Sequence, residues 1–445
     1  MQIILLYIVS QDLLAASTMI SYYIPFIGTI YFRTVLVAIL LVMVSDRIRN
    51  KSFKPKSSIM WISILVGSLF LFLSVESLLM IINGGNSSRM TKYTIGFLMK
   101  IITILIVWFY ANARFKNKKE VLRFILKPYC YFSIYVAFTG LLAWILAVFN
   151  LIEPSSWQLP ADMLSRDYQQ DYSYGTIYSF PYYLGLVTTG REIDLLGLPV
   201  FRATGLFHEG TYAAFFVLPA FFYIPFLFEG SGSKLKWRLS NILILLFAVA
   251  TYSSAGILAF SISLSVGIIN YLQMSKFNIK SFLVIIGLVI LASFVMLLFT
   301  YESGTFYRKF LLFPFYIENS MGIIDSNSLF GDGFFAIKHD FDGLARFYVP
   351  RAILSTLFQA IHIFIVLTLL LKMLFSRNHH KFLCISMLYT FIHSFKVLLF
   401  LQFTGLYMFQ LFIFALILSL SSKTITYTYQ NTTKPLKHGS VNVSL

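Results

Sequence analysis

Long apolar runs separated by short polar segments recur along almost the whole of this 445-residue chain. A helix needs about 20 mostly apolar residues to cross the hydrocarbon core of a membrane, and the runs have about that length. The pattern therefore predicts an all-α, polytopic membrane protein, a helical bundle with about 12 transmembrane helices in a single integral membrane domain over residues 1–445. The expected spans are 3–20, 27–45, 59–81, 93–112, 128–150, 210–228, 240–252, 255–273, 282–300, 351–374, 382–400 and 403–421.

The seventh and eighth spans allow two interpretations. Residues 240–273 could form two short helices that meet near Thr251, or one long kinked helix. A single helix would reverse the orientation of everything that follows it, including the polar tail over residues 422–445. The distribution of charge described below favours two helices.

Two polar segments, residues 151–209 and 301–350, are much longer than the other connections. Long ordered loops on one face often carry a binding or catalytic site. They contain 13 of the 18 acidic residues of the chain. The first is also rich in Tyr and Trp, which could pack against sugar rings or could form the aromatic belt typical of a membrane interface.

Composition excludes a soluble protein. Hydrophobic residues make up 58% of the chain and charged residues only 12%, whereas soluble domains carry about 25% charged residues. The two cysteines, Cys130 and Cys384, have neither zinc-site spacing nor a disulfide framework, and we interpret them as small buried residues.

The formal net charge of +17 is mainly a signal of orientation. If the N-terminus is cytoplasmic, the short inner segments and the tail contain 22 of the 35 Lys and Arg residues, and the outer segments contain 10. This bias follows the positive-inside rule. It predicts cytoplasmic termini and two large loops on the non-cytoplasmic side. The inner charges are expected to meet anionic lipid head groups, and no nucleic acid is expected as a partner.

Polar side chains cluster where the first large loop enters the sixth span. Arg202, His208 and Glu209 lie in one short segment between Phe201 and Tyr212. An Arg side chain can bind a phosphate through two hydrogen bonds, and Glu or His can accept a proton from a sugar hydroxyl. Alternatively, Arg202 and Glu209 could pair with each other and cap the helix.

The R-x-x-G-L-F-x-E pattern from Arg202 to Glu209 resembles a segment of the O-antigen polymerase (Wzy-type) family, which is related to the O-antigen ligases. A second likeness is Leu329–Phe334, Leu-Phe-Gly-Asp-Gly-Phe, in the second loop, with His339 after it. The resemblance implies a glycosyltransferase that polymerises oligosaccharide repeat units carried on undecaprenyl diphosphate, at the outer face of the bacterial inner membrane. The Arg that this family often has in the mid-chain helix pair is missing at Ser253–Gly256, which counts against a ligase.

The implied chemistry assigns roles to particular residues. Glu209 is the first candidate for the catalytic base, followed by His208 and His339. Cations would stabilise the diphosphate leaving group, so neither a metal nor another cofactor is expected. The expected partners are undecaprenyl-diphosphate-linked oligosaccharides, membrane lipids and, through the resemblance, a chain-length regulator protein. The candidates for binding the diphosphate and the sugar are Arg202, Arg191, Arg346, Arg351 and Tyr212.

Three other functions remain open: a ligase that transfers finished polymer, a flippase or other transporter of lipid-linked oligosaccharide, and a membrane scaffold without catalytic activity. Charged residues inside the spans suit a transporter, but they can equally be structural. We expect Asp12 to pair with Arg33, near the middle of its span, and Lys396 to reach a lipid phosphate or Glu76. The expected role of His362 and His393 is packing with hydrogen bonds.

Overall fold

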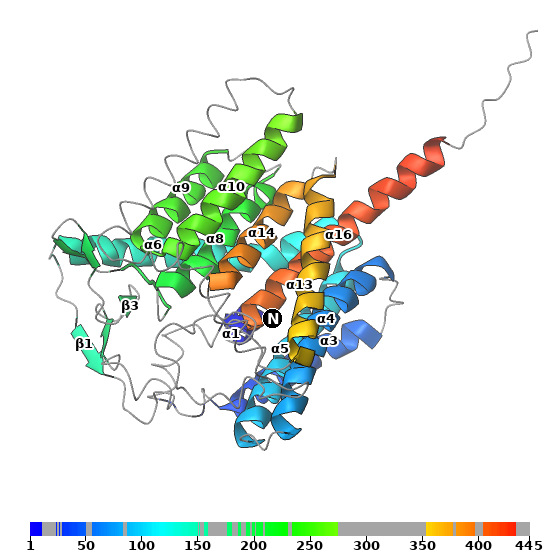
Figure 1. The fold of residues 1–445 in the computed structure, drawn as a ribbon, viewed down its shortest axis with the longest axis horizontal. Helices are drawn as coiled ribbons and strands as arrows, with labels where there is room; N and C mark the ends of the chain where they lie inside the picture. The colour runs from blue at the N-terminus through cyan, green and yellow to red at the C-terminus, as the bar shows by residue number, and fades with distance from the viewer. Residues whose placement is uncertain are drawn as a thin grey trace, which may run out of the picture.

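A computed structural model gives the fold (Figure 1). It describes residues 1–10, 24, 26, 29–49, 56–82, 87–149, 151, 155–158, 176–179, 186–187, 193–195, 198–200, 202–207, 210–229, 234–274, 353–376, 380–396 and 404–432. The predicted ninth span, residues 282–300, and the second large loop, residues 301–350, lie outside the described residues.

Eleven helices are present among the described residues, and each overlaps one of the predicted spans. Helix α9 and helix α10 are separate, so the two-helix interpretation of residues 240–273 is the correct one. The helices are α1 (Gln2–Ser10), α3 (Ile30–Arg49), α4 (Lys56–Ile82), α5 (Ser87–Arg114), α6 (Lys118–Val148), α8 (Gly210–Leu227), α9 (Lys234–Ala250), α10 (Ser254–Met274), α13 (Ile353–Leu374), α14 (Lys381–Lys396) and α16 (Thr404–Thr432).

Five of these helices contain a stretch that is long and apolar enough to cross a membrane. The stretches are Ser58–Val75, Thr94–Arg114, Lys118–Val148, Gly210–Leu227 and Leu357–Leu374, within the part of the chain that the structure describes. Helices α3, α10, α14 and α16 contain shorter apolar stretches. An all-helical membrane bundle therefore agrees with the prediction.

The outer surface of the bundle carries continuous apolar stripes. On α9, five large apolar side chains recur every three or four residues along one face and are 51–68% exposed. Exposing such a stripe to water would be unfavourable, whereas exposing it to lipid hydrocarbon costs no free energy. These side chains are Leu235, Leu239, Ile242, Leu246 and Val249.

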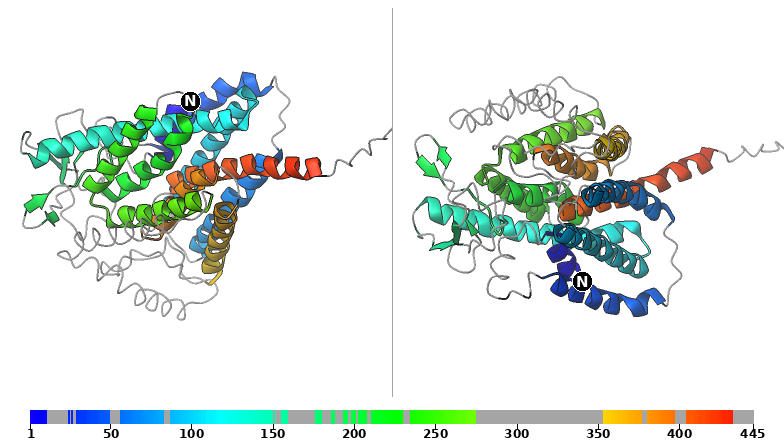
Figure 2. Two further views of the ribbon diagram at one scale, coloured as in Figure 1. Left: turned by 90° about the horizontal axis from the view of Figure 1, so that it is seen from above. Right: turned by 60° about the horizontal axis from the view of Figure 1, so that its bottom comes forward.

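Helix α16 lies at the centre of the bundle. Every residue from Gly405 to Ser419 is buried, and the helix contacts α1, α4, α5, α6 and α14. Its C-terminal end extends beyond the other helices (Figure 2) and reaches Thr432, past the predicted end at residue 421. The first part of the predicted tail is therefore helical.

The described part of the first large loop contains five short strands, which were not predicted from the sequence. Strands β1 (Ser155–Gln158), β2 (Thr176–Ser179) and β3 (Leu186–Val187) form an antiparallel sheet, with Trp157 opposite Ile177. Strands β4 (Ile193–Leu195) and β5 (Leu198–Val200) form a hairpin, with Leu195 opposite Leu198. Strands of two to four residues are too short to show the alternation of apolar and polar residues by which strands are recognised.

A capped break separates α9 from α10. Tyr252 adopts a left-handed conformation with φ 47°, which ends α9. The hydroxyl of Ser253 then accepts a hydrogen bond from the backbone N–H of Gly256 at 3.2 Å. This is the usual N-cap arrangement, and it starts α10 in a new direction.

Candidate functional site

The segment Arg202–Phe207, which carries most of the polymerase-like pattern, is built into the helical bundle. Ala203, Thr204 and Phe207 are each 0% exposed, and Phe207 belongs to the main hydrophobic core. A polar loop that joins two membrane helices would ordinarily pass over the surface. This part of the loop is instead enclosed by helices.

Backbone contacts fix the segment against α9. The N–H of Ala203 donates to the carbonyl of Ala250, the last residue of α9, at 2.8 Å. The N–H of Phe207 donates to the carbonyl of Thr204 at 3.1 Å, which closes a tight turn. Backbone groups that are enclosed in a bundle need such partners.

Two glycines allow the segment to approach α6. Gly205 has a φ of +56°, and a Cβ atom there would lie 2.7 Å from Cγ1 of Val136. A Cβ atom on Gly140 would lie 2.9 Å from Cα of Gly205 and 2.5 Å from Cε2 of Phe247. Gly140 precedes the end of α6 at Val148 by about 12 Å along the helix axis. The segment therefore enters the bundle alongside α6 to roughly that depth.

Helix α8 begins directly against the break between α9 and α10. A Cβ atom on Gly210 would lie 2.5 Å from the carbonyl oxygen of Thr251, so only glycine fits there. Gly256, in the first turn of α10, similarly faces Ala214 of α8. The amino-terminal ends of α8 and α10 thus meet next to the buried segment, and helix N-termini favour bound anions.

Two of the predicted site residues are described, and both lie beside this junction. Arg202 and Tyr212 are half-buried, Arg202 next to the residue that pairs with Ala250 and Tyr212 in the first turn of α8. The backbone residues close to Arg202 and Tyr212 in sequence therefore both lie at the C-terminal end of α9. The other six predicted residues lie outside the described residues: Arg191, His208, Glu209, His339, Arg346 and Arg351.

A buried pair from α14 supports the first two turns of α8. The hydroxyl of Tyr389 donates to the carbonyl of Ala214 at 2.9 Å and lies 2.8 Å from Nδ1 of His393. A hydroxyl has one hydrogen, so Nδ1 of His393 is the donor in the second contact. The ring of His393 also packs edge-on against Phe215, with centroids 5.1 Å apart. The sequence indicated a packed histidine, but its association with α8 depends on tertiary packing.

The second histidine of the apolar helices is also packed, away from the candidate site. His362 lies 2.7 Å from the Ser68 hydroxyl and 3.1 Å from the Tyr407 hydroxyl. Ser68 itself donates to the carbonyl of Leu65, so His362 donates from Nδ1 and accepts at Nε2. This chain of hydrogen bonds joins α4, α13 and α16.

The charged residues inside the predicted spans are partly described. Arg33 lies in the first turn of α3 rather than near the middle of a span, because α3 begins at Ile30, and its guanidinium packs against Gly96. Lys100 is 8% exposed, and its side-chain carbons pack against Gly405. The expected partners Asp12 and Glu76, and the side chain of Lys396, lie outside the described residues, so both pairings stay predictions.

Chemically, the junction combines two helix N-termini, which favour anions, with a half-buried arginine, Arg202, in the adjoining segment. No group of three or more His, Cys, Asp and Glu side chains that could hold a metal ion occurs among the described residues. Those residues do not include the acidic side chains of the two large loops. Comparisons of the chain with protein-family models, with curated proteins and with solved structures found no match.

Proposed function

We propose that this protein polymerises oligosaccharide repeat units carried on undecaprenyl diphosphate into an O-antigen or a similar surface polysaccharide. One observation supports this most strongly. The pattern that resembles the O-antigen polymerases is buried against α6 and α9 from Ala203 to Phe207, and Arg202 stands at its edge. This packing holds the backbone on either side of Arg202 in a fixed position, as a binding site requires.

The proposed reaction is a glycosyl transfer. A hydroxyl of the acceptor sugar loses its proton to a base and forms a bond to the anomeric carbon of the growing chain, while the bond to the diphosphate breaks. The base is Glu209, with His208 and His339 as alternatives. Arg202, together with Arg191, Arg346 and Arg351, stabilises the negative charge that develops on the departing undecaprenyl diphosphate. Tyr212 contacts a sugar.

The proposed setting is the inner membrane of a bacterium. Twelve spans would place both termini in the cytoplasm and both large loops in the periplasm, as the positive-inside rule requires. The proposed partners are undecaprenyl-diphosphate-linked oligosaccharides and a chain-length regulator protein. The proposed reaction needs no cofactor, because arginine side chains would stabilise the negative charge of the diphosphate in place of a metal ion.

A ligase is the nearest alternative. The family that this chain resembles often has an Arg in the mid-chain helix pair, where this chain has Ser253–Gly256, and its absence weakens a ligase in particular. Here Ser253 caps α10, and Gly256 leaves only 2.8 Å between a built Cβ and the Cβ of Ala214. The missing Arg is a feature of the sequence, and it counts against a ligase.

Deleting the gene and separating the surface glycolipids by size tests the proposal. Loss of a polymerase leaves caps of one repeat unit and removes the ladder of longer chains. Loss of a flippase leaves repeat units inside the cell, and loss of a ligase leaves polymer on its carrier lipid. An unchanged ladder would mean that the protein is none of these.

Complementation of the deletion strain then tests the site. Arg202→Ala is expected to give no ladder at a normal protein level, whereas Arg202→Lys, which keeps the charge, should retain part of it. Arg238→Ala is the matched control, because Arg238 is an exposed arginine at the other end of α9. Equal ladders from Arg202→Ala and Arg238→Ala would remove Arg202 from the site.

A further inference from the structure

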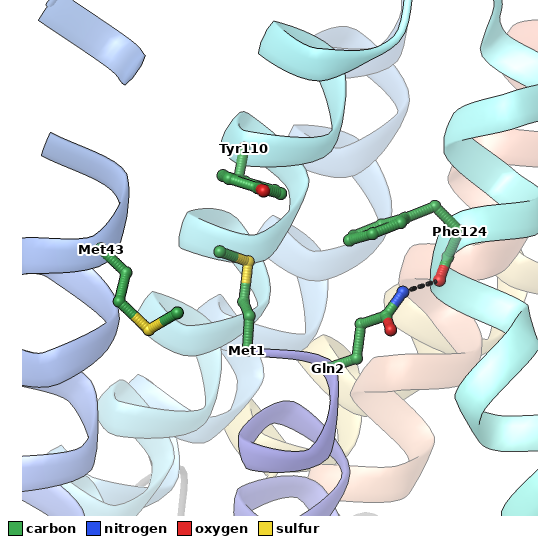
Figure 3. A pocket seen from close by; sticks show the side chains of 5 residues that line it. All are labelled: Met1, Gln2, Met43, Tyr110 and Phe124. Carbon is green, nitrogen blue, oxygen red and sulfur yellow. Dashed lines mark hydrogen bonds between the residues drawn. The ribbon is translucent and has the colours of Figure 1, made fainter. Parts of the chain in front are cut away.

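A hollow of about 280 Å³ opens on the side of the bundle where α3 and α5 end and α6 begins. It is lined by Met1, Gln2, Met43, Tyr110 and Phe124, whose side chains converge on it from α1, α3, α5 and α6 (Figure 3). Sites for whole small molecules have about 300–1,000 Å³. The hollow is therefore suited to part of a flexible molecule. The charge pattern assigns this end of the bundle to the cytoplasm.

The hollow faces lipid. Met43 is 51% exposed and its neighbour Val42 is 72% exposed, so this side of α3 is not covered by other described helices. Polar and apolar atoms share the lining about equally, with two methionines and two aromatic rings on the apolar side and the Gln2 amide among the polar groups. Such a mixed lining suits a molecule that has both a hydrocarbon part and a polar part.

A cation is fixed at the rim. Nη1 of Arg114 donates to the hydroxyl of Tyr110 at 3.3 Å, and its Cζ lies 5.4 Å and 6.0 Å from the ring centroids of Phe115 and Phe124. Tyr110 and Phe124 both line the hollow, so these contacts hold the guanidinium beside it. Arg114 is itself exposed and can present its other N–H groups to a ligand.

A side-chain amide adds a second donor. Nε2 of Gln2 donates to the carbonyl of Phe124 at 2.5 Å, as Figure 3 shows. That nitrogen carries two hydrogens, so one remains for a ligand oxygen. A hollow with polar and apolar walls, and with an Arg and an amide at its rim, matches a molecule with a phosphate and a hydrocarbon chain.

We propose that this hollow binds one anionic phospholipid of the cytoplasmic leaflet. Its phosphate accepts hydrogen bonds from Arg114 and Gln2, and part of an acyl chain lies against Met1 and Met43. A zwitterionic phospholipid also has a phosphate, but its ammonium group would lie close to the guanidinium of Arg114 and would be repelled by it. The proposal does not rest on the glycosyltransferase function.

Native mass spectrometry of the purified protein tests this proposal. The protein is mixed with phosphatidylglycerol or with phosphatidylcholine of the same acyl chains, and the retained lipid is counted. We expect one phosphatidylglycerol to be retained in preference to phosphatidylcholine. Arg114→Gln should weaken this binding about fivefold, the weight of one basic side chain beside an anionic lipid. Lys119→Gln, an exposed lysine at the same end, should not.

A second variant separates the hollow from the charge. Met43→Trp fills the hollow with a larger side chain and leaves every charge in place, so it should also reduce retention of phosphatidylglycerol. Thermal unfolding of each variant in detergent identifies any that fails to fold. Equal retention of the two lipids would overturn the proposal. So would wild-type retention by folded Arg114→Gln or folded Met43→Trp protein.

Discussion

At the scale of single residues, the glycine pair between α6 and the buried segment is the most restrictive feature of the candidate site. Alanine at Gly140 would bring Cβ to 2.5 Å from Phe247 and 2.9 Å from Gly205. Overpacking of this kind costs about 1–3 kcal/mol. We expect Gly140→Ala to lower the thermal unfolding temperature in detergent and, if the proposed function is correct, to reduce the ladder of surface polysaccharide. Gly205→Ala should cost more, since its φ of +56° is also unfavourable for alanine.

Gly67 provides the matched control. It also lies in a helix, α4, but a Cβ atom there would meet nothing within 4 Å. Alanine stabilises a helix by roughly 0.5–1 kcal/mol relative to glycine, so Gly67→Ala should keep or raise the unfolding temperature. If Gly140→Ala behaves like Gly67→Ala, the close approach of the buried segment to α6 is wrong.

The sequence could indicate only part of this contact. Gly205 and Gly210 flank polar residues in a recognisable pattern, so the sequence alone marks this segment as unusual. Gly140 lies in an apolar helix, more than sixty residues earlier in the chain, and nothing in its local sequence distinguishes it from Gly67. Only the packing of α6 against residues 203–207 and α9 gives Gly140 its importance.

At the scale of helices, Gln410 connects α16 to α6 and α8. Its Oε1 accepts from the Tyr223 hydroxyl at 2.7 Å, and its Nε2 donates to the Tyr129 hydroxyl at 3.2 Å. The hydroxyl of Tyr129 in turn donates to the carbonyl of Phe216. All three side chains are buried, so a single amide satisfies groups on two other helices.

Replacing this amide should therefore leave a buried donor without its acceptor. Gln410→Leu is expected to destabilise the protein by about 1–3 kcal/mol, because the Tyr223 hydroxyl loses its acceptor. Tyr223→Phe leaves the buried Oε1 of Gln410 without its donor and should also destabilise the protein. The double variant should be less destabilised than the sum of the two, which unfolding in detergent can measure. Additive effects would show that the two side chains do not interact.

A proline explains a second connection between helices. Pro128 of α6 has no N–H, so the carbonyl of Phe124, four residues earlier, lacks its usual helical partner. The side chain of Gln2 donates to that carbonyl and so joins α1 to α6. We expect Gln2→Leu to cost about 1 kcal/mol in the natural protein and clearly less beside Pro128→Ala, which restores the N–H. An equal cost in both backgrounds would contradict this explanation.

Most helix limits could be predicted from the sequence, because each span has to match the thickness of the bilayer. A span must be apolar over about 20 residues, so its signal is much longer than any local irregularity. The short strands of the first loop have no such requirement, and β3 has only two residues. The extension of α16 to Thr432 was missed because polar helix outside lipid carries no hydrophobic signal.

At the scale of the whole molecule, one helix decides the orientation of the second half. Helix α9 has 17 residues and is about 25 Å long, a little less than the roughly 30 Å of the hydrocarbon core. A helix of this length crosses the membrane only if the bilayer thins locally or if the side chains that flank the helix extend to the membrane surface. The exposed Lys234, Lys236 and Arg238 at its start can do so, since long basic side chains extend toward the head groups.

Cysteine labelling can establish whether α9 crosses. The two natural cysteines are fully buried, and replacing them with alanine gives a background without thiols. Tyr252→Cys, in the break after α9, should react with a membrane-impermeant maleimide on intact spheroplasts. Lys236→Cys, at the start of α9, and Lys116→Cys, before α6, should react only after lysis. If Tyr252→Cys and Lys236→Cys were labelled from the same side, α9 would not cross. The number of spans would then be odd, the tail would lie on the side opposite the N-terminus, and the positive-inside distribution would lose its explanation for the segments after α10.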